Sequence, residues 1–392
     1  MAGADVLIVG AGHGGAHAAI ALRKAGFKGS LMMIDADPSL PYERPPLSKD
    51  YLSGERSEER LLVRPESFWQ SQDIQIALGQ RVNTILPGTR AVRLASEEEV
   101  AFGELIWAGG GIPRRLDCPG NTLDGIHYVR TRQDVHGLRA DLADAKRIVI
   151  IGAGYIGLEC AATLANSGRQ ITVLEVGSRI LGRVCGVVVS SFLEAEHRRH
   201  GIDIRLADQV ESIQTGVETR LIVRCQSGDC LAADLVIVGI GIIPSVTPLL
   251  AAGAEGGNGV KVDSHCRTSL AGISAIGDCA LHANIFADGQ WLRLESVQNA
   301  IEMAGVVAAA HTGNPRHYVS VPWFWSTQFD NRIQTAGLLA GHDSTQLTGD
   351  VGECRFSVRY LRRGRLIAAE CINSPREFMA VRNELGRLYE AR

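Results

Sequence analysis

The stretch "DVLIVGAGHGG" at residues 5–15 decides the fold of this chain. Its apolar run at 6–9 is typical of a parallel strand that is buried on both faces. The pattern G-x-G-x-x-G follows, and residues 16–26 continue as a helix. Such a turn lets the backbone approach a pyrophosphate, which then lies at the helix N-terminus. We therefore expect a dinucleotide to contact the turn residues Gly10, Gly12, His13, Gly14 and Gly15.

An acidic side chain ends the next apolar run. "SLMMIDAD" at 30–37 predicts a second strand with Asp35 near its end. A carboxylate at this position can accept hydrogen bonds from ribose hydroxyls. Asp37 is the alternative acid, because both side chains follow the same strand.

The same device returns in "RIVIIGAGYIGLECAATLANSGRQITVLE" at 147–175, which ends in Glu175. Two complete strand, turn, helix, strand and acid units are strong evidence for two dinucleotide sites. A third apolar strand, "LVIVGIGIIP" at 235–244, fits the end of the second nucleotide domain. The second nucleotide is expected to contact Gly152, Gly154, Tyr155, Ile156, Gly157, Gly239 and Gly241.

Two further stretches complete a protein that holds a flavin and a nicotinamide nucleotide. "LIWAGGGIPRRL" at 105–116 is an apolar strand that enters a glycine-rich turn, where the chain can cross between domains. "ISAIGDCA" at 273–280 ends in Gly277 and Asp278, and this acid can accept a hydrogen bond from a ribityl hydroxyl. Taken alone, either stretch also fits an ordinary turn, and their order after the two nucleotide units favours the flavin interpretation.

Composition excludes several other classes. The 392 residues are 45% apolar with a net charge of −3, which gives no support to nucleic-acid binding. No apolar run reaches the ~18 residues that a membrane span needs. The nine cysteines are scattered and no secretory signal precedes the first strand, so we expect reduced thiols and a cytoplasmic protein. No cysteine pattern indicates a metal site.

These motifs together resemble the FAD-dependent NADH:ferredoxin reductases of bacterial oxygenase systems, which include the putidaredoxin, biphenyl-dioxygenase and rubredoxin reductases. The matching stretches span nearly the whole chain: "VGAGHGG", "LPYERPPLSKDYL", "AGGGIPRRL", "IIGAGYIGLE", "VGIGIIP", "AIGDCA", "ESVQNA" and "PWFWSTQFD". The resemblance implies non-covalent FAD, NADH, and a [2Fe-2S] ferredoxin that serves a Rieske dioxygenase or P450 monooxygenase. A monomer and a homodimer are both compatible with it.

The resemblance also implies an α/β architecture of three domains. Residues 1–113 and 247–322 would form a discontinuous FAD domain with a Rossmann-like sheet, and residues 114–246 the Rossmann-like NAD domain. Residues 323–392 would form a small α+β domain that closes over the flavin. In this tail, strand-like runs precede a final helix that is expected at 375–390.

In proteins of this kind the proline-rich segment "PYERPPLSK" runs along the flavin. The resemblance places Arg44 on the adenosine or pyrophosphate side, and Lys49 beside the isoalloxazine in a pair with Glu159. It places Glu159 and Glu295 at the nicotinamide and Trp325 at the flavin edge; alternatively, Trp325 is only a core aromatic. The remaining expected FAD contacts are Val82, Ala108, Gly109, Arg115, Ser296 and Val297.

Glu175 favours NADH, because a carboxylate accepts a hydrogen bond from a free 2′-hydroxyl and repels a 2′-phosphate. Arg179 and Arg183 are the counter-evidence. They would contact the pyrophosphate, or accept NADPH if their loop folds back.

Other members of the superfamily use a redox cysteine early in the chain, but the first cysteine here is Cys118, and Lys49 occupies the position where such enzymes have one. We interpret Cys225 and Cys230 as flanking a hairpin turn.

The alternative functions are an NADH oxidase, a rubredoxin reductase, or a redox-signalling flavoprotein of the apoptosis-inducing-factor type. Candidate basic patches for a partner are Arg362, Arg363 and Arg365, and Arg64, Arg114 and Arg115.

Overall fold

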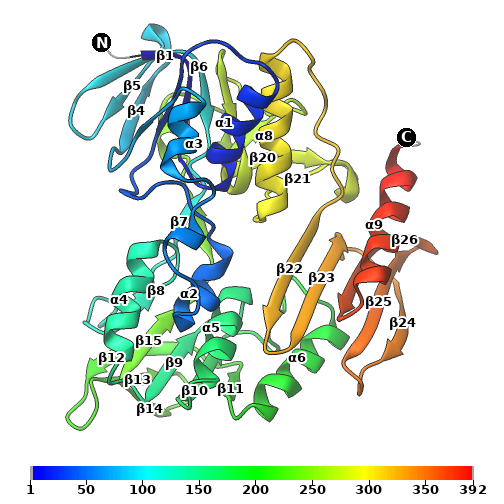
Figure 1. Cartoon of the computed structure of the whole chain (residues 1–392). Helices are drawn as coiled ribbons and strands as arrows, with labels where there is room; N and C mark the ends of the chain where they lie inside the picture. The colour runs from blue at the N-terminus through cyan, green and yellow to red at the C-terminus, as the bar shows by residue number, and fades with distance from the viewer. Residues whose placement is uncertain (1–2, 391–392) are drawn as a thin grey trace.

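The computed structural model describes residues 3–390, which form three sheet-based parts (Figure 1). The first sheet has the order β3-β2-β1-β6-β5-β4, and β19 also pairs with β6. Its strands β1, β2, β3 and β6 are parallel, as the buried run at 6–9 predicts. The bounds are β1 Gly3–Val9, β2 Leu31–Ile34, β3 Ile74–Ala77, β4 Val82–Leu86, β5 Ala91–Leu94, β6 Glu99–Trp107 and β19 Ile273–Ala275.

Helices α1 (His13–Lys24) and α8 (Val297–His311) pack against each other beside this sheet. Because α8 follows residue 296, the first part is built from two distant stretches of chain, shown blue and yellow in Figure 1. A small sheet of β17 Gly256–Gly257, β18 Gly259–Val262, β20 Ala280–Asn284 and β21 Gln290–Leu292 adjoins it. The short helices near this part are α3 Glu66–Ser71, α7 Thr247–Ala251, η3 Pro87–Thr89, η4 Gly277–Cys279 and η5 Ile285–Ala287.

The second part has an all-parallel sheet in the order β11-β10-β9-β15-β8. Its strands are β8 Ile126–Tyr128, β9 Arg147–Ile151, β10 Gln170–Glu175, β11 Asp203–Leu206 and β15 Leu235–Val238. The helices are α4 Arg132–Leu142, α5 Tyr155–Ala165 and α6 Val187–Arg199. A separate antiparallel sheet consists of β12 Val210–Thr215, β13 Leu221–Cys225 and β14 Cys230–Ala233.

The two parts are joined by a pair of antiparallel strands, β7 (Gly111–Pro113) and β16 (Ile242–Pro244). They stand between the upper and lower sheets in Figure 1. The glycine-rich turn after residue 107 therefore leads from the first part to the second.

The proline-rich segment and the residues that follow it, 41–63 together, extend from the first part onto the second. It folds into the short helices η1 (Pro45–Ser48), α2 (Asp50–Ser53) and η2 (Glu59–Leu61). Leu47 and Tyr51 lie in the same hydrophobic core as Ile150 of the second sheet. Burial of these side chains fixes the segment across the gap between the two sheets.

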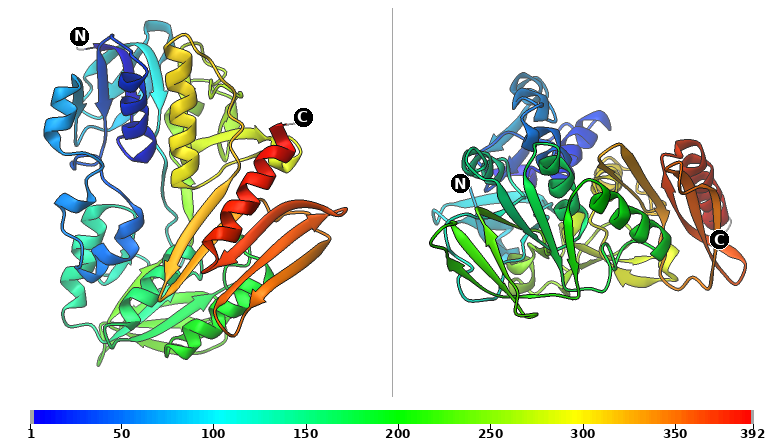
Figure 2. Two further views of the ribbon diagram at one scale, coloured as in Figure 1. Left: turned by 45° about the vertical axis from the view of Figure 1, so that its right-hand side comes forward. Right: turned by 90° about the horizontal axis from the view of Figure 1, so that it is seen from below.

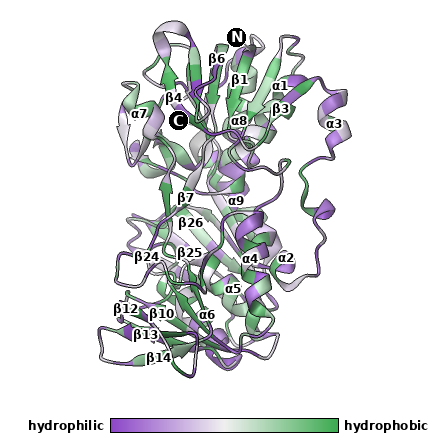
Figure 3. Cartoon of the chain, turned by 90° about the vertical axis from the view of Figure 1, so that its left-hand side faces the viewer, coloured by the Kyte–Doolittle hydropathy of each residue, from purple (hydrophilic) through white to green (hydrophobic). Residues whose placement is uncertain are grey.

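The C-terminal part is a five-stranded antiparallel sheet in the order β22-β23-β26-β25-β24, covered by α9 (Pro375–Glu390). The strands are β22 Trp323–Gln328, β23 Asn331–Gly337, β24 Ser344–Asp350, β25 Arg355–Arg362 and β26 Arg365–Ile372. Figure 2 shows this sheet to one side of the other two. Figure 3 shows hydrophobic residues concentrated on the inner strands and hydrophilic ones on α3 and the outer loops.

The α/β class with parallel sheets and an antiparallel C-terminal part is confirmed. The final helix has the expected bounds. The domain boundaries that we assigned stay predictions. In the described residues, no helix is long and apolar enough to cross a membrane.

Candidate functional site

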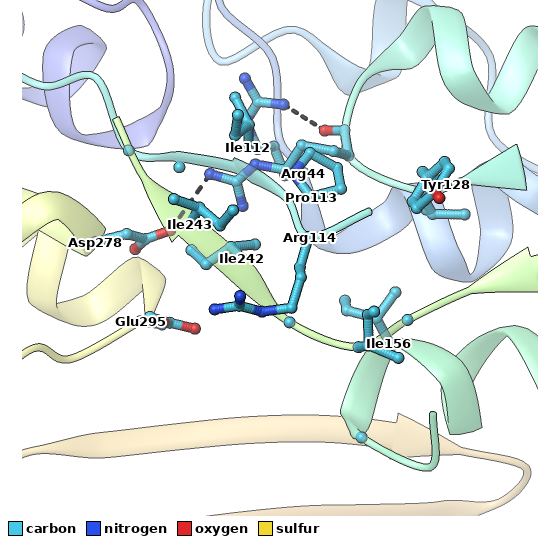
Figure 4. A pocket seen from close by; sticks show the side chains of 18 of the residues that line it. Arg44, Ile112, Pro113, Arg114, Tyr128, Ile156, Ile242, Ile243, Asp278 and Glu295 are labelled. Atoms are coloured by element: carbon cyan, nitrogen blue, oxygen red, sulfur yellow. Dashed lines mark hydrogen bonds and ion pairs between the residues drawn. The ribbon is translucent and has the colours of Figure 1, made fainter. Parts of the chain in front are cut away.

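One cavity of about 1870 Å³ extends from the first glycine turn to the second. Its middle section is lined by the connecting strands β7 and β16 and by charged side chains from several elements (Figure 4). A cavity of this size exceeds the 300–1,000 Å³ that holds one ordinary small ligand. It therefore has room for more than one such ligand.

Glycine is required at both turns because the backbone comes very close to itself. Gly10 has φ +99°, and a Cβ there would lie 2.4 Å from the carbonyl oxygen of Ala108. A Cβ on Gly15 would lie 1.7 Å from the carbonyl oxygen of Gly10. Gly152 has φ +100°, and a Cβ on Gly157 would lie 2.1 Å from its carbonyl oxygen. In both turns the first glycine permits the bend and the third lets helix and strand pack closely.

The acid that ends each second strand accepts a hydrogen bond from its own glycine turn. Asp35 Oδ2 accepts from the backbone N–H of Ala11 at 2.5 Å, and Glu175 Oε2 accepts from Ala153 at 2.8 Å. Both carboxylates also line the cavity. Asp37 Oδ2 accepts from the hydroxyl of Tyr42 at 2.6 Å. The more directly placed acid at the first turn is therefore Asp35.

Positively charged side chains gather around the first turn. Arg44 donates to the backbone carbonyl of Arg130, and Arg130 Nη2 lies 3.4 Å from Asp278 Oδ2 (Figure 4). Burial, reinforced by the charge of Arg44, lowers the pKa of His13 to about 4. The imidazole is therefore neutral at pH 7, and the two guanidinium groups together with the N-terminus of α1 make the turn suited to a pyrophosphate.

Lys49 and Glu159 meet at the centre of the site. Lys49 Nζ lies 2.5 Å from Glu159 Oε2, so the expected ion pair is present. The carboxylate is only 3% exposed and also accepts from Ser48 Oγ at 2.5 Å and Ser326 Oγ at 2.6 Å. These partners compensate the hydration that the buried carboxylate loses.

The start of α8 forms another wall. Ser296 caps this helix by accepting from the N–H of Asn299 at 3.1 Å, so the helix N-terminus at Val297 adjoins the cavity. Glu295 lies on the cavity wall with Oε1 2.9 Å from Arg293 Nη1. Trp325 of β22 lines the cavity with its ring 5.5 Å from that of Trp323.

Nearly all residues expected at the two nucleotides line this one cavity. On the FAD side they are Gly10, Gly12, His13, Gly14, Asp35, Asp37, Arg44, Lys49, Val82, Ala108, Gly109, Arg115, Gly277, Asp278, Ser296, Val297 and Trp325. On the NAD side they are Gly152, Gly154, Tyr155, Ile156, Glu159, Glu175, Arg183, Gly239, Gly241 and Glu295. Gly15 and Gly157 are not among the lining residues, because their role is the packing of helix on strand.

The structure adds wall residues that sequence reasoning missed. Arg130 contributes a half-buried cation and Thr131 caps α4, yet both follow an unremarkable short strand, β8. Trp107, Ile276 and Phe324 also line the cavity. Only Trp107 had a usable signal, since it directly precedes the glycine-rich turn at 108–111.

The cysteines of the described chain are all free. Cys225 and Cys230 end β13 and begin β14, and the N–H of Cys225 bonds to the carbonyl of Asp229, so they flank a hairpin turn as predicted. Cys118 lines the cavity, where burial and Asp117 raise its pKa. Within residues 3–390, no group of three or more histidine, cysteine, aspartate or glutamate side chains is placed to hold a metal ion.

Comparison with known proteins decides the family. Residues 4–304 match the model of the pyridine nucleotide-disulphide oxidoreductases, and residues 323–391 match the reductase C-terminal model. The chain belongs to the ferredoxin reductases of bacterial oxygenase systems. Two curated relatives are 50% identical and cover 96% of this chain and 91% of their own length. They are the ferredoxin reductase subunit of 5,5′-dehydrodivanillate O-demethylase from Sphingobium and a ferredoxin–NAD(P)+ reductase from Sphingomonas.

A solved structure supports the same assignment. Putidaredoxin reductase in its covalent complex with putidaredoxin superimposes with a TM-score of 0.94 at 36% identity. The match covers 99% of this chain and 94% of that chain. The protein is therefore a ferredoxin–NAD(P)+ reductase, an oxidoreductase whose family binds FAD and NAD(P)H.

Proposed function

We propose that this protein passes electrons from NADH, through non-covalently bound FAD, to a [2Fe-2S] ferredoxin that serves a Rieske dioxygenase or a P450 monooxygenase. The observation that carries the proposal is the single cavity that both glycine turns line, with the Lys49–Glu159 pair between them. The names of the relatives support the acceptor: one is a subunit of an O-demethylase, and another was solved bound to putidaredoxin.

The first turn fits the adenosine diphosphate half of FAD. The N-terminus of α1, Arg44 and Arg130 suit a pyrophosphate, and Asp35 suits a ribose. Asp278 also lines the cavity, and its carboxylate suits ribityl hydroxyls as hydrogen-bond donors. The N-terminus of α8 at Val297 offers backbone N–H groups to the pyrimidine edge of the ring system.

The second turn fits NADH better than NADPH. Glu175 lines the cavity as an acceptor, and Val176 follows it where a phosphate-binding cation would be needed. Arg179 donates to the carbonyl oxygens of Cys185 and Gly182, both at 2.8 Å, so its guanidinium is engaged in holding its own loop. Arg183 lines the cavity and is suited to the pyrophosphate.

FAD, when bound, supplies the chemistry that accepts two electrons from a nicotinamide and releases them singly. The chain supplies positions and charge. Lys49 places a cation beside the ring system, where negative charge develops on reduction. Glu159 and Glu295 mark the two sides of the space for the nicotinamide, and Trp325 and Phe324 of β22 close the cavity. Close placement of donor and acceptor accounts for most of the rate advantage.

The acceptor is a protein in this proposal because the site offers no thiol pair for a small disulfide or peroxide substrate. Cys118 is the one cysteine among the residues that line the cavity. Of the two basic patches, Arg362 lies 2.6 Å from Asp288, and the guanidinium of Arg115 lies 4.0 Å above the Tyr128 ring. Both patches are thus partly occupied by internal contacts, and the docking surface stays a prediction.

NADH-driven reduction of cytochrome c, with and without an added [2Fe-2S] ferredoxin, tests the proposal. We expect a rate that rises at least about tenfold when ferredoxin is present, since the flavin alone transfers electrons poorly to a non-partner. Equal rates with and without ferredoxin would favour an NADH oxidase. The same assay with a rubredoxin in place of the [2Fe-2S] ferredoxin tests the rubredoxin reductase alternative. A higher rate with rubredoxin than with ferredoxin would favour that alternative.

A further inference from the structure

A buried chain of hydrogen bonds leads from α6 to the Lys49–Glu159 pair. His197 Nε2 contacts Gln328 Oε1 at 2.9 Å, and Gln328 Nε2 donates to Ser326 Oγ at 3.3 Å. Ser326 Oγ donates to Glu159 Oε1 at 2.6 Å. We call His197, Gln328 and Ser326 the donor chain.

The direction of the donor chain is fixed by its chemistry. Gln328 uses its amide nitrogen toward Ser326, so its oxygen faces His197 and can only accept. Burial lowers the pKa of His197 to about 4, so the ring is neutral at pH 7 and carries its single proton on Nε2. Each hydrogen bond of the chain is therefore donated in the direction of the Glu159 carboxylate.

All members of the donor chain are excluded from water. Exposure is 0% for His197 and Ser326 and 1% for Gln328. Hydrogen bonds in such surroundings polarise one another, and an ionised acceptor strengthens them further. The chain therefore acts on Glu159 as an oriented set of dipoles whose positive ends face the carboxylate.

The donor chain joins parts of the molecule that are distant in sequence. His197 comes from α6, Gln328 and Ser326 from β22, and Glu159 from α5. Asn331, at the start of β23, donates to Glu196 Oε2 at 3.4 Å, so the tip of the β22–β23 hairpin is tied to α6 a second time. Figure 1 shows this tip above α6.

We propose that the donor chain positions the charged Glu159 carboxylate, and through it holds Lys49 at the electron-accepting group of the cavity. Ser326, Gln328 and His197 are positioning residues in this proposal, which rests on the proposed function because it assumes that FAD lies beside Lys49. Loss of a donor leaves the Glu159 carboxylate less firmly held, so it pairs less closely with Lys49 and compensates less of the lysine charge. An uncompensated cation stabilises the reduced flavin.

The midpoint potential of the bound flavin tests this in the purified holoenzyme. Glu159→Gln removes the carboxylate charge completely, so it should give the largest shift of the midpoint potential, in the positive direction. Ser326→Ala should shift the potential in the same direction by part of that amount, and Ser326→Thr, which keeps the hydroxyl, should restore the wild-type value. Ser357→Ala is the matched control, because Ser357 is 3% exposed in β25 of the same sheet and lies outside the donor chain. It should leave the potential unchanged.

A Ser326→Ala potential equal to that of wild type overturns the proposal for the donor chain and leaves the proposed function intact. An unchanged Glu159→Gln potential overturns it too. A wild-type protein that binds no flavin overturns both proposals. If Ser326→Ala does not fold, Gln328→Met is the test, since this variant removes the amide that donates to Ser326. A Gln328→Met potential equal to that of wild type would likewise overturn the proposal for the donor chain.

Discussion

The Glu175 carboxylate accepts hydrogen bonds from two backbone N–H groups, that of Ala153 at 2.8 Å on one oxygen and that of Gly177 at 2.7 Å on the other. Asp35 makes the matching pair of contacts with Ala11 and Asp37 in the first unit. Each acid thus stabilises the turn beside its own nucleotide site. In this way each turn and the carboxylate that we propose for ribose binding form one preorganised structure.

The first prediction concerns nucleotide choice. Glu175→Gln keeps an acceptor for the turn but removes the charge that repels a 2′-phosphate. We expect the ratio of kcat/KM for NADH over NADPH to fall about tenfold, equivalent to ~1.4 kcal/mol. Steady-state kinetics with both nucleotides measures it. Glu211→Gln, at an exposed position of β12, is the control, and an unchanged ratio in Glu175→Gln would remove the basis for the NADH assignment.

The second prediction concerns the packing glycines. Gly15→Ala should reduce the free energy of unfolding by about 3 kcal/mol or more, because its Cβ would lie 1.7 Å from the Gly10 carbonyl oxygen. Gly137→Ala in α4 has open space around it and should stabilise the protein by about 0.5–1 kcal/mol. Denaturant unfolding distinguishes them. A Gly15→Ala variant as stable as wild type would show that the turn has another geometry.

The third prediction concerns pH and the buried carboxyl group of Glu370. Burial raises the pKa of Glu370 above its ordinary value of 4.5, although Tyr360 and the N–H of Gly186 donate to it. The folded protein then binds this proton more tightly than the unfolded chain does. The contribution of Glu370 to stability is therefore most favourable below pH 4.5 and is lost as the pH rises through the raised pKa.

Glu370→Gln should remove this loss. Comparison of the urea midpoints of wild type and variant at pH 5 and pH 8 gives the test, with the wild type losing more stability between the two values. If both proteins change by the same amount, Glu370 does not titrate in the way its burial requires.

The fourth prediction concerns the cysteine pair on the hairpin. Burial raises the pKa of Cys225 to about 11, and neither Cys225 nor Cys230 is among the residues that line the cavity. A thiol of this kind is a poor nucleophile at pH 7. The double variant Cys225→Ser with Cys230→Ser should keep ferredoxin-dependent turnover within about twofold of wild type. A loss of turnover with flavin still bound would point to a redox disulfide.

The nucleotide-binding turns could be predicted because each glycine and acid has a steric or charge requirement that is visible in a short stretch. The C-terminal part could be predicted less fully. β24 is exposed at every position and β22 carries partly buried aromatics, so neither shows the alternation of a half-buried strand. Arg130 escaped notice because its environment depends on Arg44 and Asp278, which are distant in sequence.

Spatial relations between distant segments explain the other differences. The proline-rich segment was expected at the flavin from its resemblance to known proteins, and no local pattern shows that Leu47 and Tyr51 enter the core of the second part. Likewise, Ser326 follows Trp325 in sequence, but its contact with Glu159 depends on how β22 meets α5. Hydrophobic periodicity specifies elements, and only the tertiary structure specifies which polar groups meet.

An anaerobic titration of the purified, flavin-loaded protein with NADH tests the central claim most directly. We predict that the visible absorbance of the oxidised flavin falls to its reduced level at about one equivalent of NADH per flavin, since NADH and FAD each carry two electrons. A protein that retains no flavin after reconstitution, or whose yellow colour persists in excess NADH, would contradict the account.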